Sequence, residues 1–187
     1  MKKSKKLVMA ATLLIAVILL VAFNVKEKPN ESNSNAVVVA ADWERAKAYT
    51  LEYLNASTDE VINFKPTADM RTFGQQMLHI AEANYGFASA ASGKANPVPF
   101  GSLEKSDKLK TKDAVTKEVI ASYDFVIAAS KEMADAKMGE TIKLFNTFDV
   151  SRGAAMEKAF EHQTHHRGQA TVYLRLKGIT PPQEKLF

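Results

Sequence analysis

The chain has 187 residues, a formal net charge of +4 and no cysteine. The absence of cysteine excludes disulfide bonds and thiolate ligands, so a bound metal would need histidine, carboxylate or water as ligands. The mild positive charge comes largely from the lysines of the first six residues, and no basic patch interleaved with aromatic residues follows, which argues against nucleic-acid binding.

The N-terminal region, residues 1–23, predicts an export signal. Its lysines precede an unbroken apolar run, residues 7–23, which is long for a cleaved signal peptide and at the short limit for a membrane span. Because no small-residue cleavage site follows closely, an uncleaved signal anchor is favoured over a cleaved signal peptide. The positive-inside rule then places the remaining chain outside the cytoplasm, either membrane-anchored or, after cleavage, secreted or periplasmic.

Residues 24–41 are polar at first and predict a flexible tether, whose last six residues either dock on the domain or lead into its first helix. Residues 42–187 have the length of one domain with one core. Their apolar spacing predicts four helices: 42–55, 67–91, 111–133 and 151–178. Between them, residues 92–110 predict a loop, and residues 141–145 a short strand or an extended strap. The predicted fold class is all-α, a four-helix bundle.

Two histidines lie four residues apart in the last predicted helix. At about 100° per residue, His162 and His166 fall within the apolar stripe, His165 falls on its flank, and Arg167 falls on the solvent side. A buried imidazole needs a partner for its ring nitrogens, and one divalent metal would satisfy two rings together. The pair His162 and His165 is the second choice. Ordinary core histidines bonded to backbone or carboxylate groups are the alternative to a metal site.

A further histidine, His79, lies in the second predicted helix. It shares a narrow polar face with Gln75, Glu82 and Gly86. Such an isolated polar stripe usually faces water, although it could also line a polar cavity between helices. The residues alone therefore indicate a solvated histidine.

Several motifs resemble the DinB/YfiT-like family of metal-dependent enzymes. They are WERAK (43–47), MLHIAEANY (77–85), EHQTHHRGQ (161–169) and YLRLKGI (173–179). The resemblance covers residues 42–182 and implies a four-helix bundle in which His79, His162 and His166 bind one divalent ion, zinc or nickel. It overturns the interpretation of His79 as solvated. Three imidazoles leave an open coordination position, as in catalytic sites.

Four polar residues lie within one or two helical turns of these histidines. They are expected to bond the ligands or line the pocket, with solvent exposure or packing as the alternative for each: Gln75, Glu82, Gln169 and Tyr173.

The family resemblance implies transfer of a low-molecular-weight thiol to an electrophilic small molecule. The export signal weakens that analogy, since cytosolic thiol cofactors are scarce outside the cytoplasm. Two alternatives stay open: a metal-water hydrolase of a small substrate, and a membrane-tethered bundle that binds metal or ligand without catalysis. The second alternative has support because Lys158, not a glutamate, stands four residues before His162. No catalytic residue is identified, a small-molecule substrate is the expected partner, and a homodimer is left open.

Overall fold

The computed structural model describes residues 35–133 and 135–187. The expected signal segment, residues 1–23, and the tether up to residue 34 lie outside the described residues, so both stay predictions. Among the described helices, none is both long enough and apolar enough to cross a membrane. That finding does not extend to the apolar run at 7–23.

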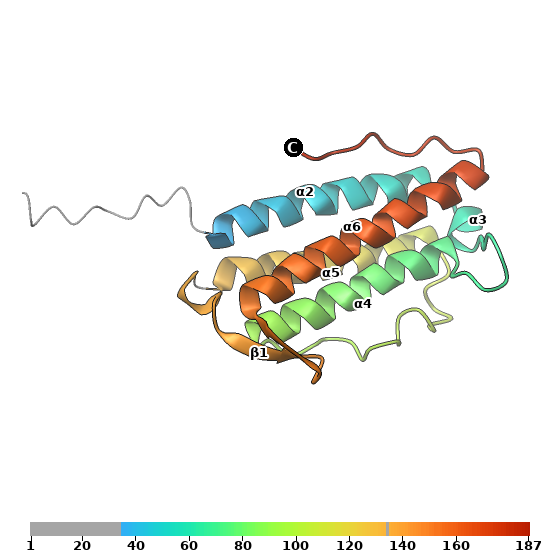
Figure 1. Ribbon diagram of the computed structural model, residues 1–187. Coiled ribbons are helices and arrows are strands. Elements are labelled where there is room, and N and C mark those ends of the chain that lie inside the picture. Colours follow the sequence, from blue (N-terminus) through green and yellow to red (C-terminus); the bar gives the residue numbers. More distant parts are fainter. Residues whose placement is uncertain (1–34, 134) are drawn as a thin grey trace, which may run out of the picture. The chain divides into compact units, whose positions relative to one another are not determined.

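Four long helices and a β-hairpin build the described domain (Figure 1). The long helices are α2 (Asn35–Ala56), α4 (Phe73–Ser92), α5 (Lys112–Glu132) and α6 (Arg152–Leu176). Shorter elements are α3 (Asp59–Ile62), the 3₁₀ helix η2 (Asp135–Lys137), β1 (Thr141–Leu144) and β2 (Phe148–Ser151). Helix α4 packs against both α5 and α6, and α2 packs mainly against α5. The domain is therefore mainly helical, as predicted, with a hairpin added.

Local capping explains where the helices begin. The Ser151 hydroxyl accepts a hydrogen bond from the Ala154 N–H at 3.1 Å, which starts α6 at the predicted residue. Helix α4 begins at Phe73, later than the predicted residues 67–70, because Thr72 and Gln75 form a reciprocal capping box. Residues 35–41, expected in the tether, form the first turns of α2.

For residues 141–145 the sequence left two alternatives, a short strand and an extended strap. The structure shows the strand: β1 pairs antiparallel with β2, and Thr141 lies opposite Ser151. The hairpin leads directly into the N-cap of α6. Strand β1 contacts both α4 and α6, and Phe145 at the hairpin tip packs against α4.

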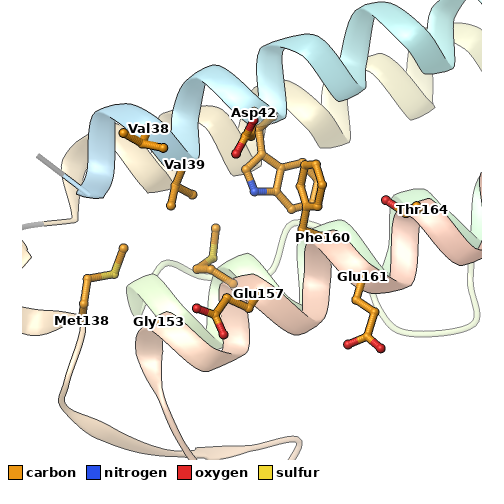
Figure 2. Close-up of a pocket in the computed structure, with 11 residues that line it drawn as sticks. Val38, Val39, Asp42, Met138, Gly153, Glu157, Phe160, Glu161 and Thr164 are labelled. Carbon is orange, nitrogen blue, oxygen red and sulfur yellow. The ribbon is translucent and has the colours of Figure 1, made fainter. Parts of the chain in front are cut away.

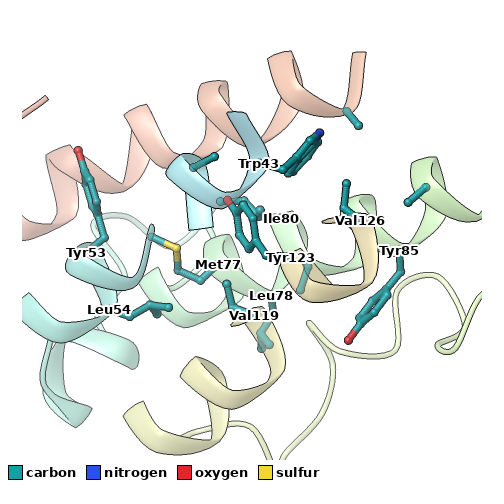
Figure 3. Packing of buried hydrophobic residues seen from close by; sticks show 14 of the residues in the cluster. Trp43, Tyr53, Leu54, Met77, Leu78, Ile80, Tyr85, Val119, Tyr123 and Val126 are labelled. Carbon is teal, nitrogen blue, oxygen red and sulfur yellow. The ribbon is translucent and has the colours of Figure 1, made fainter. Parts of the chain in front are cut away.

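The core is a layer of large side chains between the helices (Figure 3). Trp43 of α2 packs edge-on against Tyr123 of α5 and Phe160 of α6, with ring centroids 5.7 and 5.4 Å away. Gly74 allows α4 to approach α3 closely, because a Cβ at that position would lie 2.8 Å from Ile62 Cγ2. Helices α4 and α6 also pack against each other, and the candidate site forms between them.

Candidate metal centre

Three half-buried histidine rings meet between α4 and α6. His79 comes from α4, and His162 and His166 come from successive turns of α6. The ring centroid of His79 lies 5.0 Å from that of His162 and 4.5 Å from that of His166, and the last two are 4.4 Å apart. One nitrogen from each ring lies within 4.8 Å of the others. The structure thus brings together the three residues that the family resemblance selected.

The two α6 rings are held in the neutral form. Burial lowers the pKa of His162 to about 4 and the pKa of His166 to about 3, and the neighbouring histidines shift both in the same direction. A neutral imidazole keeps a lone pair, which is the form that binds a metal. In addition, His162 Nδ1 is buried without a hydrogen-bond partner among the described residues. Converging neutral imidazoles and an unpartnered buried nitrogen fit a divalent cation.

A carboxylate holds the third ring. Glu104 Oε1 lies 2.6 Å from His79 Nδ1, and Glu104 Oε2 accepts a hydrogen bond of 2.6 Å from Arg71 Nε. Burial acts to raise the pKa of Glu104, but the hydrogen bonds from His79 and Arg71 outweigh it and lower this pKa to about 2. An ionised carboxylate therefore accepts the Nδ1 proton of His79, the usual arrangement around metal-binding histidines.

Glu104 was not identified from the sequence. It lies in the loop between α4 and α5, 25 residues from His79. Nothing in the periodicity or composition of that loop separates Glu104 from Asp107, which is exposed. Only the path of the loop across α4 reveals the contact.

The two polar neighbours expected beside His79 bond the loop rather than the ring. Both oxygens of the Glu82 carboxylate accept backbone N–H groups of the loop, including that of Leu103 at 2.5 Å. Gln75 completes the cap of α4 and donates to the Glu104 carbonyl at 3.2 Å. Each reaches His79 through residue 104, so the expected direct bonds to the histidine are absent.

On the α6 side, an amide that was not identified from the sequence contacts His166. Gln76, which is 2% exposed, lies 2.7 Å from His166 Nδ1 and also bonds the side chain of Gln169. Gln169 in turn lies 2.8 Å from His165 Nε2. Gln169 therefore supports His166 through Gln76. Gln76 follows Gln75 in the chain, and only the packing of α4 against α6 reveals its contact with His166.

Tyr173 was expected to line the pocket, but it has a packing role. Its hydroxyl donates to the Arg71 carbonyl at 3.0 Å, and its ring packs edge-on against Phe64 and Phe73. The hydrogen bond ties α6 to the segment that carries Arg71, one of the two partners of Glu104.

The expectation for Arg167 was wrong. Instead of facing solvent it is 6% exposed, donates to Gln163 Oε1 at 2.6 Å and stacks over the Tyr49 ring at 4.4 Å. A helical wheel assumes one covered face, whereas α2 also covers this side of α6. By contrast, His165 is exposed. It therefore does not replace His162 or His166 in the cluster.

An aromatic wall closes one side of the histidine cluster. The Phe87 ring lies 5.9 Å from the His162 ring and 4.9 Å from that of Phe145 at the hairpin tip. Phe145 has a positive φ of 50°, and Gly86 leaves room for it, since a Cβ there would lie 3.4 Å from the Phe145 ring. Helix α4 thus places the Phe87 ring beside His162, and the hairpin tip packs against Phe87.

A separate cavity of about 690 Å³ lies between the N-terminal parts of α2 and α6 (Figure 2). Val39, Met138 and Phe160 give it an apolar lining, and Glu157 lies at its edge. None of the three clustered histidines lines it. The cavity is therefore distinct from the candidate metal centre.

Comparisons with known proteins agree with this architecture. The uncharacterized protein YrdA of Bacillus subtilis strain 168 is 28% identical over 146 residues, which cover 75% of this chain and 81% of YrdA. A DinB-like protein of Bacillus cereus has a similar structure, with a TM-score of 0.63 and 21% identity over 79% of this chain and 95% of its own. The DinB-like protein YjoA of B. subtilis also has a similar structure, with a TM-score of 0.61 and 19% identity over 80% of this chain and 96% of its own.

The solved structures establish the fold. The sequence itself matches the DinB superfamily over residues 42–170, which span all three clustered histidines and more than half of the chain. This protein therefore belongs to the DinB superfamily, a superfamily of metal-binding proteins.

Proposed function

We propose that His79, His162 and His166 hold one divalent metal ion, zinc or nickel, and that this centre transfers a small thiol to an electrophilic small molecule. The observation that carries the proposal is the convergence of three imidazole rings, with nitrogens within 4.8 Å of one another. The depressed pKa values of His162 and His166 support it, because both rings are ready to bind a cation at neutral pH.

When bound, a divalent ion with an open coordination position lowers the pKa of a thiol, so that thiolate is present at neutral pH. The chain has no cysteine, so the thiol comes from a second substrate. Around the site, Glu104 keeps the proton on His79 Nδ1, Gln76 orients the His166 ring, and Phe87 shields His162 from water.

The carboxylates near the cluster favour thiol transfer over hydrolysis. A water nucleophile benefits from a general base whose pKa lies near the working pH. Glu104 has a pKa of about 2 and is bonded to both Arg71 and His79, which makes it a weak base. The oxygens of Glu82 are occupied by backbone N–H groups. A thiol, with an ordinary pKa of about 8.5, needs less assistance than water.

The test uses the full-length protein loaded with zinc. It is mixed with a panel of electrophiles (an aryl chloride, an epoxide and an α,β-unsaturated ketone), with and without cysteine or 2-mercaptoethanol. We expect a thioether product that requires added thiol, disappears in His162→Ala and persists in His165→Ala, because His165 is exposed outside the cluster. Turnover that is unchanged when every thiol is omitted would reject transfer in favour of hydrolysis, and no turnover at all would reject an enzymatic role.

The exported location remains a proposal that follows from the sequence, whereas the homodimer stays an open alternative. Fractionation of cells, with detection of the full-length chain in the membrane fraction, tests the signal anchor expected at residues 7–23. Light scattering of the purified protein tests the dimer. A cytoplasmic chain would contradict the exported location, and a monomer would exclude the dimer.

A further inference from the structure

Glu82 is a buried carboxylate that binds the backbone of the loop between α4 and α5. It is 1% exposed and lies three residues beyond His79 on α4. Its Oε2 accepts the Gly101 N–H at 2.9 Å, and its Oε1 accepts the N–H groups of Leu103 at 2.5 Å and Glu104 at 3.2 Å. These three donors compensate the buried charge.

The same hydrogen bonds argue against Glu82 as a metal ligand. One of its oxygens lies within 4.8 Å of ligand atoms of His79 and Glu104, which makes a second, acidic metal site geometrically conceivable. A carboxylate engaged by three backbone donors would have to give up those bonds to bind an ion. We therefore interpret Glu82 as an anchor for the loop.

Every polar group of residue 104 is held by this arrangement. Its N–H bonds Glu82, its carbonyl accepts from Gln75, and its carboxylate bonds His79 and Arg71. Gln75, His79 and Glu82 are spaced at one helical turn, so they lie on one face of α4. The narrow polar face seen in the sequence is thus a docking strip for the loop, and the buried Leu103 adds an apolar contact.

We propose that Glu82 is a positioning residue for the metal centre. By fixing the backbone at residues 101–104, it keeps the Glu104 carboxylate on His79 Nδ1. The proton then stays on Nδ1, and the lone pair stays on Nε2. The effect on metal affinity rests on the proposed function, whereas the effect on the loop and on the His79 tautomer exists in the metal-free protein.

The first experiment therefore uses the metal-free, full-length protein. NMR measures the exchange of the Gly101 and Leu103 amide protons and the ¹⁵N shifts of the His79 ring, in wild type, Glu82→Gln and Glu104→Gln. We expect Glu82→Gln to speed the amide exchange by about ten-fold or more. Both variants are expected to turn the single His79 tautomer into a mixture. Unchanged exchange and unchanged ring shifts in Glu82→Gln would overturn the proposal.

A matched control is Glu118→Gln. Glu118 of α5 accepts a hydrogen bond of 3.2 Å from the Tyr85 hydroxyl of α4, but among the described residues it bonds neither the loop nor the histidines. This variant should leave the His79 shifts as in wild type; a change equal to that of Glu82→Gln would show a general effect of losing a charge and overturn the proposal. If Glu82→Gln does not fold, Glu82→Asp keeps the charge, shortens the reach by one methylene and is held to the same criteria.

Zinc affinity provides the second measurement. Competition with a chelator should show a loss of about 10- to 100-fold in Glu82→Gln, the range found when partners of metal-binding residues are removed. Full wild-type affinity in a variant whose His79 tautomer is mixed would overturn the link to the metal centre. A wild-type protein that binds no zinc, but whose loop responds as expected, would instead reject the proposed function and leave the anchoring role intact.

Discussion

Metal binding at this centre should release few protons in mild acid. Three ordinary histidines with a pKa of about 6.5 would together carry about 2.3 protons at pH 6 and would lose them on binding a metal. In the folded protein the pKa of His162 is about 4 and that of His166 is about 3, so both rings are already neutral at pH 6. At most one ligand is then left to lose a proton.

The same reasoning gives the expected loss of affinity in acid. Between pH 7.5 and pH 5.0, competition from protons costs about 30-fold for each ordinary histidine, or about 3 × 10⁴-fold for three. With His162 and His166 neutral throughout this interval, at most one histidine competes for protons, so the loss should fall far below the value for three ordinary histidines. The lowered pKa values reduce the loss of metal affinity in acid, because protons compete with a metal only below the pKa of the free ligand.

Calorimetric titration with zinc at pH 6 counts the protons, when it is repeated in buffers of different ionisation enthalpy. Release of about one proton or fewer is the expected result. Release of two or more would show that the α6 rings are protonated in the free protein. The burial argument for these two histidines would then be wrong.

Two further predictions concern stability and are checked by urea unfolding. Gly74→Ala should destabilise the protein by about 1–3 kcal/mol, because its Cβ would lie 2.8 Å from Ile62 Cγ2. Gly168→Ala should stabilise the protein by about 0.5–1 kcal/mol, since nothing lies within 4 Å of a Cβ at that helical position. If Gly168→Ala were the more destabilising of the two, the packing of α3 on α4 would be contradicted. Arg167→Met should cost about 2–4 kcal/mol by removing buried charged hydrogen bonds and the stacking on Tyr49, while zinc binding persists; a cost below about 0.5 kcal/mol, the level of an exposed side chain, would contradict its structural role.

The helices and part of the site were predictable because their determinants are local. Apolar spacing and the Ser151 cap define α6, and the spacing of His162 and His166 puts both rings on one face. The start of α4 was also encoded locally, in the capping box of Thr72 and Gln75, but the prediction placed it several residues too early.

The remaining features depend on how separate elements meet. Arg167 was misplaced because its burial depends on α2, which a wheel drawn for α6 alone omits. His79 joined the site only through the family resemblance, since its own helix face is polar. Glu104 had no signal, because a carboxylate in a loop becomes a partner of His79 only when the loop crosses α4. Contacts between distant segments are tertiary, and periodicity does not report them.

The metal content of the purified full-length protein tests the central claim most directly. Wild type and the variants His79→Ala, His162→Ala, His166→Ala and His165→Ala are dialysed against zinc and analysed by mass spectrometry. We expect one zinc per chain in wild type and in His165→Ala, and a loss of affinity of about 100-fold or more in each of the other three, beyond the effect of removing a partner of a ligand. Stoichiometric zinc in any of those three variants, or an equal loss in His165→Ala, would contradict a centre built from His79, His162 and His166.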